Sequence, residues 1–299
     1  MVITPRQYRG ERDLQAMRRL LISAGEGAYR AGYLHAGDVV WRLWDTLIDY
    51  DPGRVVSLFE DEDGSLLGFA LFYPMYAGFG LQVHPEHRGG GTEEGMLAWA
   101  ERRARSLARE EGHYGAIDAW DTFEGDAGRI ALLGRRGFVR RPEVYYLAAR
   151  SLDGPLPALE PPPGFVVRAL AGEAEAAERV AHRPEVTPGR YRAFMRAPGY
   201  DRDLDLVAVA PDGRFGAYGV CWMDPANGVG EFEPVGTRPG FRGRGLARAV
   251  LVEGFRRMKA RGARTALVCF EGDNDPARRL YRSVGFDVRS TIYTYTKGA

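Results

Sequence analysis

The chain has 299 residues, a length typical of two domains, and is 45% hydrophobic and 27% charged. This composition excludes a disordered or fibrous protein. The formal net charge of +1 argues against a general nucleic-acid or membrane-surface binder. The two cysteines, Cys221 and Cys269, are too few for a disulfide framework or a four-ligand zinc site, and no stretch approaches the ~20 apolar residues of a membrane span. We therefore expect a cytoplasmic protein with no membrane partner.

In chain order, the first half shows helical spacing of apolar residues over 12–23 and 92–109, with a hairpin turn at 61–64. Five prolines then follow within residues 151–163, too many for a helix or a central strand. We expect a stiff, extended linker there. The predicted organisation is a domain at 1–150, the linker at 151–163 and a second domain at 164–299.

The second half predicts the element order β-α-α-β-β-β-α-β-α-β. Strands are expected at 165–170, 205–210, 216–223, 230–237, 263–270 and 288–296, and helices at 172–181, 188–195, 243–261 and 276–284. The turn Pro211-Asp212-Gly213 joins two of the strands as a hairpin.

Three short segments of the first half recur in the second half, in the same order. Residues 83–91 align with 237–245, the sequence FEGD occurs at 123–126 and 270–273, and Gly-Phe occurs at 137–138 and 285–286. Self-similarity at a fixed period indicates a duplicated domain. We therefore expect the first half to repeat the element order of the second.

A glycine-rich turn before the helix at 243–261 is the most specific feature. Gly243 and Gly245 allow a tight turn with consecutive exposed N–H groups, and the positive end of the helix dipole points to the same place. The turn lacks the third small residue and the later acidic residue of a dinucleotide-binding fold, and the Gly-Lys-Ser/Thr of a P-loop. We expect a pyrophosphate cradle, with Arg242 and Arg244 in contact with phosphate.

The charge around this turn supports an anionic ligand. Nine basic residues and one acid, Glu253, lie between Arg238 and Arg264. Those beyond Arg248 fit the solvated face of an amphipathic helix. The arrangement predicts a small polyphosphate ligand held at one junction rather than a nucleic-acid surface.

Two segments of the second half together resemble the GNAT superfamily of acyl-CoA-dependent N-acyltransferases. Residues 242–247, RGRGLA, match the motif Arg/Gln-x-x-Gly-x-Gly/Ala, and residues 274–286, NDPARRLYRSVGF, match the signature Asn-x-x-Ala-x-x-Leu-Tyr-x-x-x-Gly-Phe. The resemblance covers most of 164–299 and, with the internal repeat, implies a tandem-domain member of the family. It implies an α+β (mixed α/β) fold in which each domain is a mixed, mostly antiparallel sheet flanked by helices.

The resemblance also implies acetyl-CoA as the acyl donor and no metal. The pyrophosphate is expected on the glycine-rich turn, and the pantetheine along the strand before it. The implied cofactor-binding residues are Val235, Gly236, Thr237, Arg242, Gly243, Arg244, Gly245, Leu246 and Ala247. Asn274 either caps the following helix or touches CoA, and the sequence does not separate these roles.

Acyl transfer to an amine requires a base, because an alkyl amine with a pKa of about 10.4 is mostly protonated at neutral pH. The candidates are Glu231 and Glu233, two residues apart on one strand. Pro234 predicts a bulge or a splayed strand edge beside Glu233, which we therefore favour. Tyr281, at the tyrosine of the family signature, is the candidate acid for the leaving thiolate. The alternatives are exposed carboxylates without a role and a tyrosine that only packs.

The first half lacks these groups. Alignment from Gly137-Phe138 places Leu133 opposite Tyr281, and alignment from Arg88 places Phe79 and Ala77 opposite Glu233 and Glu231. Glu93 stands where the loop motif has glycine or alanine, and a carboxylate there would satisfy the helix dipole and repel a phosphate. We expect a catalytically inactive copy, with vestigial CoA binding left open.

Other groups of residues indicate a function less specifically. His84 and His87 are three residues apart, but Pro85 predicts a loop and no third ligand is apparent nearby, so we expect no metal site. The acceptor-side candidates, from the region where the resembling fold admits its acceptor, are Tyr191, Tyr200, Asp205 and Trp222.

Two functions follow from these observations. The first is an N-acetyltransferase that moves an acetyl group from acetyl-CoA to a small-molecule amine by direct attack. The second is a non-catalytic CoA-binding or scaffold protein built from two copies of the fold. Glu233 and Tyr281 in one copy only favour the enzyme. A homodimer is compatible with the sequence, and no motif specifies the acceptor.

Overall fold

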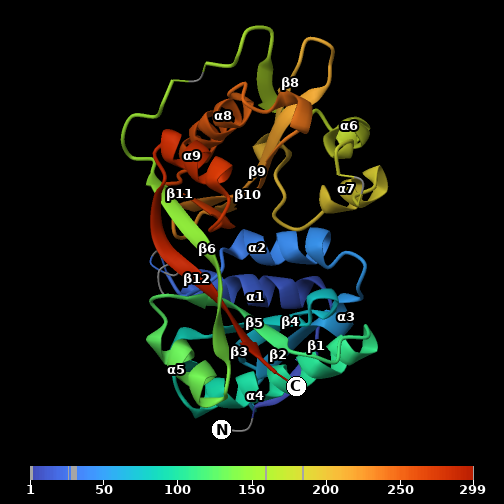
Figure 1. Ribbon diagram of the computed structural model, residues 1–299, viewed down its shortest axis with the longest axis vertical. Coiled ribbons are helices and arrows are strands. Elements are labelled where there is room, and N and C mark those ends of the chain that lie inside the picture. The colour runs from blue at the N-terminus through green and yellow to red at the C-terminus, as the bar shows by residue number, and fades with distance from the viewer. Residues whose placement is uncertain (1–2, 26, 28–31, 159, 184, 299) are drawn as a thin grey trace. The chain divides into compact units, whose positions relative to one another are not determined.

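The computed structural model describes residues 3–25, 27, 32–158, 160–183 and 185–298. The chain divides into two units (Figure 1): unit 1 contains Met1–Tyr146 and Ser290–Ala299, and unit 2 contains Leu147–Arg289. The division at Tyr146 lies close to the predicted boundary at residue 150. The end of the chain differs from the prediction, because residues 290–299 belong to unit 1 rather than to the second domain.

This difference arises from the closing strands of the two repeats. β12 (Asp287–Lys297) pairs antiparallel with β5 (Ile117–Phe123), so its end completes the sheet of unit 1. β6 (Val139–Ser151) begins in unit 1 and ends in unit 2, where it neighbours β11 (Thr265–Glu271). A sequence repeat does not show which of two similar sheets a closing strand joins.

Unit 1 is a mixed sheet in the order β1-β2-β3-β4-β5-β12. Neighbouring strands are antiparallel except β4 and β5, which are parallel. Its further elements are β1 (Thr4–Gln7), α1 (Glu11–Ser23), α2 (Ala36–Trp41), the π-helical turn η1 (Arg42–Thr46), α3 (Pro52–Val55), β2 (Val56–Glu60), β3 (Leu66–Tyr73), η2 (Pro74–Tyr76), β4 (Gly78–Val83), η3 (Pro85–His87), α4 (Gly91–Glu110) and α5 (Ala127–Arg135).

Unit 2 has the strand order β6-β11-β10-β9-β8-β7. β7 to β10 are antiparallel, and β10 runs parallel to β11. Its further elements are β7 (Val166–Ala169), η4 (Glu173–Glu175), α6 (Ala176–Val180), α7 (Pro188–Phe194), η5 (Arg202–Leu204), β8 (Asp205–Val209), β9 (Phe215–Asp224), β10 (Val229–Thr237), η6 (Pro239–Phe241), α8 (Leu246–Ala260) and α9 (Asp275–Ser283). The predicted mixed, mostly antiparallel sheet in each half is confirmed.

Helices cover both faces of each sheet. In Figure 1, α4 of unit 1 and α8 of unit 2 each lie on one side of their strands, with α1 and α2, or α6 and α7, on the other. α8 takes this place because its apolar stripe is buried, including Val250 and Phe255. Phe255 packs edge-on against Phe232 of β10, with ring centroids 5.5 Å apart. The core of unit 2 therefore fixes β10 against α8.

Two predicted helices differ in extent. The helix predicted at 243–261 begins at Leu246, because Gly243 (φ 74°) and Gly245 (φ 78°) are left-handed and belong to the preceding turn. The helix predicted at 172–181 is the 3-10 turn η4 followed by the short α6. Among the described residues, no helix is both long and apolar enough to span a membrane.

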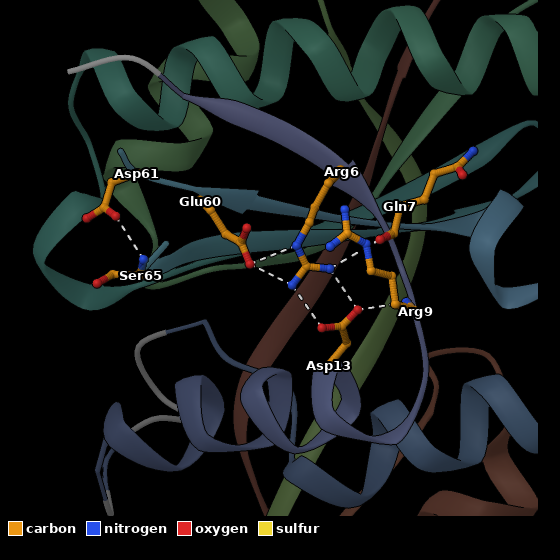
Figure 2. Close-up of polar contacts among 7 residues, drawn as sticks. All are labelled: Arg6, Gln7, Arg9, Asp13, Glu60, Asp61 and Ser65. Carbon is orange, nitrogen blue, oxygen red and sulfur yellow. Dashed lines mark hydrogen bonds and ion pairs between the residues drawn. The ribbon is translucent and has the colours of Figure 1, made fainter. Parts of the chain in front are cut away.

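One ion-pair cluster ties the first strand of unit 1 to its neighbours (Figure 2). The Arg6 guanidinium donates to Asp13 on α1 at 2.7 and 2.8 Å and to Glu60 on β2 at 2.5 and 2.8 Å. These hydrogen bonds, first to Asp13 and then to Glu60, raise the pKa of Arg6. The Asp61 carboxylate accepts the Ser65 N–H at 2.8 Å across the turn between β2 and β3, which confirms the predicted hairpin.

Candidate functional site

The strand pair β10–β11 opens partway along its length. The two strands pair from Val229↔Thr265 to Phe232↔Val268 and no further. On its other edge, β10 continues to pair with β9 as far as Thr237, after a bulge between Phe232 and Val235. Residues 233–237 thus offer one edge of main-chain N–H and C=O groups to an extended ligand. The bulge predicted from Pro234 is confirmed.

The two candidate bases lie on either side of the point where the strands part. Glu231 is in the paired section and is 2% exposed, whereas Glu233 is half-buried at the start of the opening. The buried Trp222 indole donates from Nε1 to the Glu233 carbonyl oxygen at 2.7 Å. This bond holds the main chain of the bulge in place, which fixes where the Glu233 side chain starts.

Tyr281 of α9 is the candidate acid, and it is 7% exposed. Its ring packs against Phe270 and Phe286, with centroid distances of 5.3 and 5.8 Å. Burial, followed by the negative charge of Glu233, raises the pKa of Tyr281. The phenol is therefore protonated at neutral pH and is able to donate a proton.

The predicted cradle lies at the start of α8. Arg242, Gly243, Arg244 and Gly245 are exposed, while Leu246 and Ala247 are buried at 1% and 8% exposure. Among the described residues, nothing accepts the main-chain N–H groups of residues 243–245. The Arg244 guanidinium lies over the Phe241 ring at 5.5 Å. This is the geometry of an anion site at a helix N-terminus.

Positive charge remains concentrated at this end of the helix. Of the nine basic residues counted in the sequence, Arg238 pairs with Glu178, Arg257 with Glu253, and Arg261 with Asp201 and Asp203. In the described part of the chain, the arginines with no carboxylate partner near the cradle are Arg242, Arg244 and Arg248. The unneutralised charges lie where a phosphate would bind.

The remaining predicted contact residues flank the cradle. Val235, Gly236 and Thr237 are half-buried and pair with β9 opposite Gly219, Tyr218 and Ala217. The Asn274 side chain accepts the Ala277 N–H at 3.1 Å. Of the two roles considered for Asn274, this hydrogen bond is that of the helix cap.

Three of the acceptor-side candidates form a buried cluster. The Asp205 carboxylate is fully buried and accepts from the Tyr191 and Tyr200 hydroxyls, the latter at 2.8 Å, and from Arg179 at 3.4 Å. Their polar groups are therefore bonded to one another. Trp222 is buried too and binds the bulge. These contacts favour a supporting role over direct contact with an acceptor.

The sequence did not predict a further set of interacting side chains in unit 2, formed by Arg179, His182 and Tyr218. The Arg179 guanidinium is 1% exposed and lies 3.8 Å above the Tyr218 ring, and the His182 ring is 4.9 Å from Tyr218. Burial, then the charge of Arg179, lowers the pKa of His182 to about 4, so the imidazole is neutral at pH 7. Tyr218 lies where a Cβ at Gly236 would be. No short motif marks these residues, because they meet only through the fold.

Unit 1 repeats this architecture with its own side chains in the loop. Glu93 accepts the Gly89 N–H at 2.5 Å and forms a buried ion pair with Arg129. Burial alone would raise the pKa of Glu93, but the charge of Arg129 and the Gly89 N–H outweigh it and lower the pKa. Arg88 pairs with Asp126. The cradle of unit 1 is therefore closed by an internal anion, as the sequence predicted.

The strands of unit 1 differ as well. β4 pairs with β3 without interruption from Gly78↔Tyr73 to Val83↔Gly68, so it has no bulge like the one at Glu233. Leu133 is fully buried and holds on α5 the place that Tyr281 holds on α9. No acid or base comparable to those of unit 2 lies at these places.

A parallel strand pair that parts beside a bulge, with an anion cradle at the next helix, offers an open strand edge and an anion site to one extended, phosphate-bearing ligand. This arrangement agrees with the acyl-CoA site that the resemblance to the GNAT family implies. Residues 173–286 match the acetyltransferase (GNAT) family. The chain is also 35% identical to the mycothiol acetyltransferase of Kineococcus radiotolerans, over 82% of this chain and 82% of the relative. The chain belongs to the GNAT family of acetyltransferases, whose acyl donor is acetyl-CoA, and is an N-acetyltransferase.

Further comparisons agree. The mycothiol acetyltransferase of a Nocardioides species is 33% identical, over 73% of this chain and 79% of the relative. A tandem GNAT protein from the clavulanic acid biosynthesis pathway superposes with a TM-score of 0.68 at 16% identity, covering 99% of this chain and 98% of that one. A GCN5-related N-acetyltransferase from Sphaerobacter thermophilus gives 0.64 at 24% identity, with 99% and 95% coverage. The predicted tandem fold is confirmed.

Proposed function

We propose that unit 2 binds acetyl-CoA and transfers the acetyl group to the primary amine of a small molecule, with Glu233 as base and Tyr281 as acid. The observation that carries the proposal is the open edge of β10. The edge begins at Glu233, whose charge further raises the pKa of the buried Tyr281, and leads along β10 towards the cradle at the start of α8.

The chain offers matching groups for each part of the cofactor. The N–H groups of Gly243, Arg244 and Gly245, with Leu246 and Ala247 in the first helical turn, would hold the pyrophosphate. The Arg242 and Arg244 side chains would add charge-assisted hydrogen bonds. The free edge of Val235, Gly236 and Thr237 would pair with pantetheine.

The proposed chemistry follows from the protonation states. Glu233 takes a proton from the ammonium form of the acceptor, and the freed nitrogen lone pair attacks the thioester carbonyl carbon. The carbon–sulfur bond then breaks, and Tyr281 donates its proton to the leaving sulfur. The bonded nitrogen gives its second proton to the Tyr281 phenolate, and Glu233 releases its proton to solvent. The products are an amide, a free thiol and one proton. Glu233 is preferred to Glu231 because its charge acts on Tyr281 and it lies at the opening, whereas Glu231 is buried in the paired section.

The acceptor is proposed from the relatives. Both relatives are named mycothiol acetyltransferases, so the unacetylated form of mycothiol is the first acceptor to test. We place the enzyme in the cytoplasm, because Cys221 and Cys269 are free thiols.

The test is turnover of acetyl-CoA with a panel of amines, the unacetylated form of mycothiol first, followed by thiol release and by the mass of the product. We expect an acetyl gain on the amine and one free thiol per amide. Tight acetyl-CoA binding with no turnover on any amine would support the scaffold hypothesis instead.

A further inference from the structure

A cluster of metal-binding side chains lies in unit 1, on the loop between β4 and α4. His84, Glu86 and His87 each offer a ligand atom, and these atoms all lie within 4.8 Å of one another. The expectation that no third ligand lies near the two histidines is therefore wrong. The third ligand is Glu86, which lies between the two histidines in the sequence.

The backbone brings the three side chains together. Pro85 begins the 3-10 turn η3, and the His87 N–H donates to the His84 carbonyl oxygen at 2.9 Å. Residues three apart on a 3-10 turn lie nearly above one another. The two imidazole centroids are accordingly 5.8 Å apart, with Glu86 between them in sequence. The cluster is a product of the turn and needs no distant element to form.

The donor set suits a divalent transition metal. Two imidazoles and one carboxylate are ligands that Zn²⁺ accepts, at about 2.0–2.2 Å each, with a further position for water. Tetrahedral ligands at that radius lie about 3.3 Å apart, so the side chains must approach one another by roughly 1.5 Å. The exposed Glu86 and the half-buried His87 can do so by side-chain rotation.

A second observation supports a ligand at this place. The Nδ1 atom of His84 is buried and, among the described residues, has no hydrogen-bond partner. Buried polar atoms without a partner are few in folded proteins. The neighbouring Arg88 would repel a cation, but its guanidinium is paired with Asp126.

The cluster is separate from the proposed acetyl-transfer site. The aligned residues of unit 2 are Arg238, Gly240 and Phe241, which carry no such donor set. The donors thus occur only in the repeat whose cradle is closed by Glu93.

We propose that His84, Glu86 and His87 bind one Zn²⁺-type divalent ion in unit 1, with water completing the coordination. The ion holds the β4–α4 loop in the 3-10 conformation and takes no part in acetyl transfer. The full chain, freed of metal by a chelator, is titrated with Zn²⁺ against a chromophoric chelator and, separately, with Co²⁺.

We expect one equivalent of Zn²⁺ per chain and a Co²⁺ spectrum without a thiolate charge-transfer band. His87→Ala should weaken binding about tenfold or more, as ligand loss exceeds the effect of outer-sphere changes. Glu86→Gln should weaken it to a lesser extent. The matched control is His113→Ala, which removes an exposed histidine of the same unit outside the cluster and should leave binding unchanged.

A far-UV circular dichroism spectrum and a thermal unfolding profile unchanged from the parent chain would establish that unit 1 of each variant remains folded. The proposal is overturned if Zn²⁺ binds no better than to a chain carrying both His87→Ala and Glu86→Gln. It is also overturned if His113→Ala weakens binding as much as His87→Ala, or if Co²⁺ shows a thiolate band.

Discussion

The turns after β4 and β10 have the same backbone plan and opposite electrostatics. Each follows a strand with a 3-10 turn and a left-handed glycine, Gly89 or Gly243, and then begins the long helix. In unit 1 the N–H of Gly89 is bonded to Glu93, while at the aligned place unit 2 has Ala247. One side chain therefore decides whether the helix N-terminus is satisfied from within or is available to a ligand.

The openings beside the two parallel strand pairs show the same contrast. The fifth residue of β5 is Asp121, whose carboxylate binds Arg42 at 2.7 and 3.0 Å and lies where a Cβ at Gly80 of β4 would be. The fifth residue of β11 is Cys269, a thiol in place of the carboxylate. Unit 1 thus has ion pairs both at its loop and beside its parallel strands, the two places where we propose that unit 2 holds acetyl-CoA. The two units share a backbone scaffold and differ in the side chains at the turn and beside the parallel strands.

The largest expected effect concerns the base. Glu233→Gln should lower kcat by about 10³-fold, within the range of general base catalysis, with acetyl-CoA affinity unchanged. Steady-state kinetics with saturating amine measure it. Glu231→Gln serves as the paired variant; a large loss there and none at Glu233 would reverse the assignment.

Tyr281→Phe should lower kcat by several hundredfold, on the order of 10²–10³, because the leaving thiolate loses its proton donor. The change imitates the apolar side chain that unit 1 has at Leu133. An acetyl donor whose thiol leaves readily without protonation should restore the rate of this variant. Equal loss with acetyl donors bearing good and poor leaving groups would argue for a packing role of the ring instead.

Glu93→Ala should destabilise unit 1 by about 3 kcal/mol, because Arg129 would be left buried without its carboxylate. The chain should gain no acetyl-CoA site, since Asp121 and Arg42 still fill the opening. Thermal unfolding and calorimetry measure both effects. Glu94→Ala, one residue along and exposed, is the control for helix substitution. A second acetyl-CoA bound by Glu93→Ala would refute the account of unit 1.

Ala247→Glu should close the cradle of unit 2 with an internal carboxylate, as Glu93 does in unit 1. We expect the acetyl-CoA Kd to rise about 100-fold, because charge-assisted hydrogen bonds to the phosphates, worth roughly 1.5–3 kcal/mol each, are lost. Ala247→Gln has nearly the same shape without the charge. If the two variants bind equally, size rather than charge controls the site.

The smallest expected effect is a dependence of the stability of unit 2 on pH. With a folded pKa of about 4 and an ordinary value of 6.5, His182 stabilises the fold fully above pH ~6.5 and progressively less as pH falls towards 4. Allowing for partial exposure, we expect a loss of about 1 kcal/mol between pH 7.5 and 5. Unfolding of His182→Gln should lack this loss, and His113→Gln should keep it. The aligned partner of Tyr218 in unit 1 is Phe69, so no similar group is expected there.

The sequence predicts those parts of the site that depend on local spacing. The turn is predicted by Gly243 and Gly245, and the bulge by Pro234, because the backbone preferences of glycine and proline are intrinsic. Glu93 is recognisable as a carboxylate at a helix start for the same reason.

Contacts between distant segments are not predictable in this way. The pairing of Glu93 with Arg129, and of Asp121 with Arg42, joins residues far apart in the chain through the fold alone. The burial of Asp205 beneath two tyrosines is of the same kind. So is the pairing of β12 with β5 in the sheet of unit 1, because it joins strands that are far apart in the chain.

The most direct test of the central claim is the stoichiometry of acetyl-CoA binding by isothermal titration calorimetry. The account predicts one site per chain in the parent protein, weakened beyond detection at the same concentrations in Ala247→Glu. Two sites in the parent, or one site that Ala247→Glu leaves intact, would contradict it.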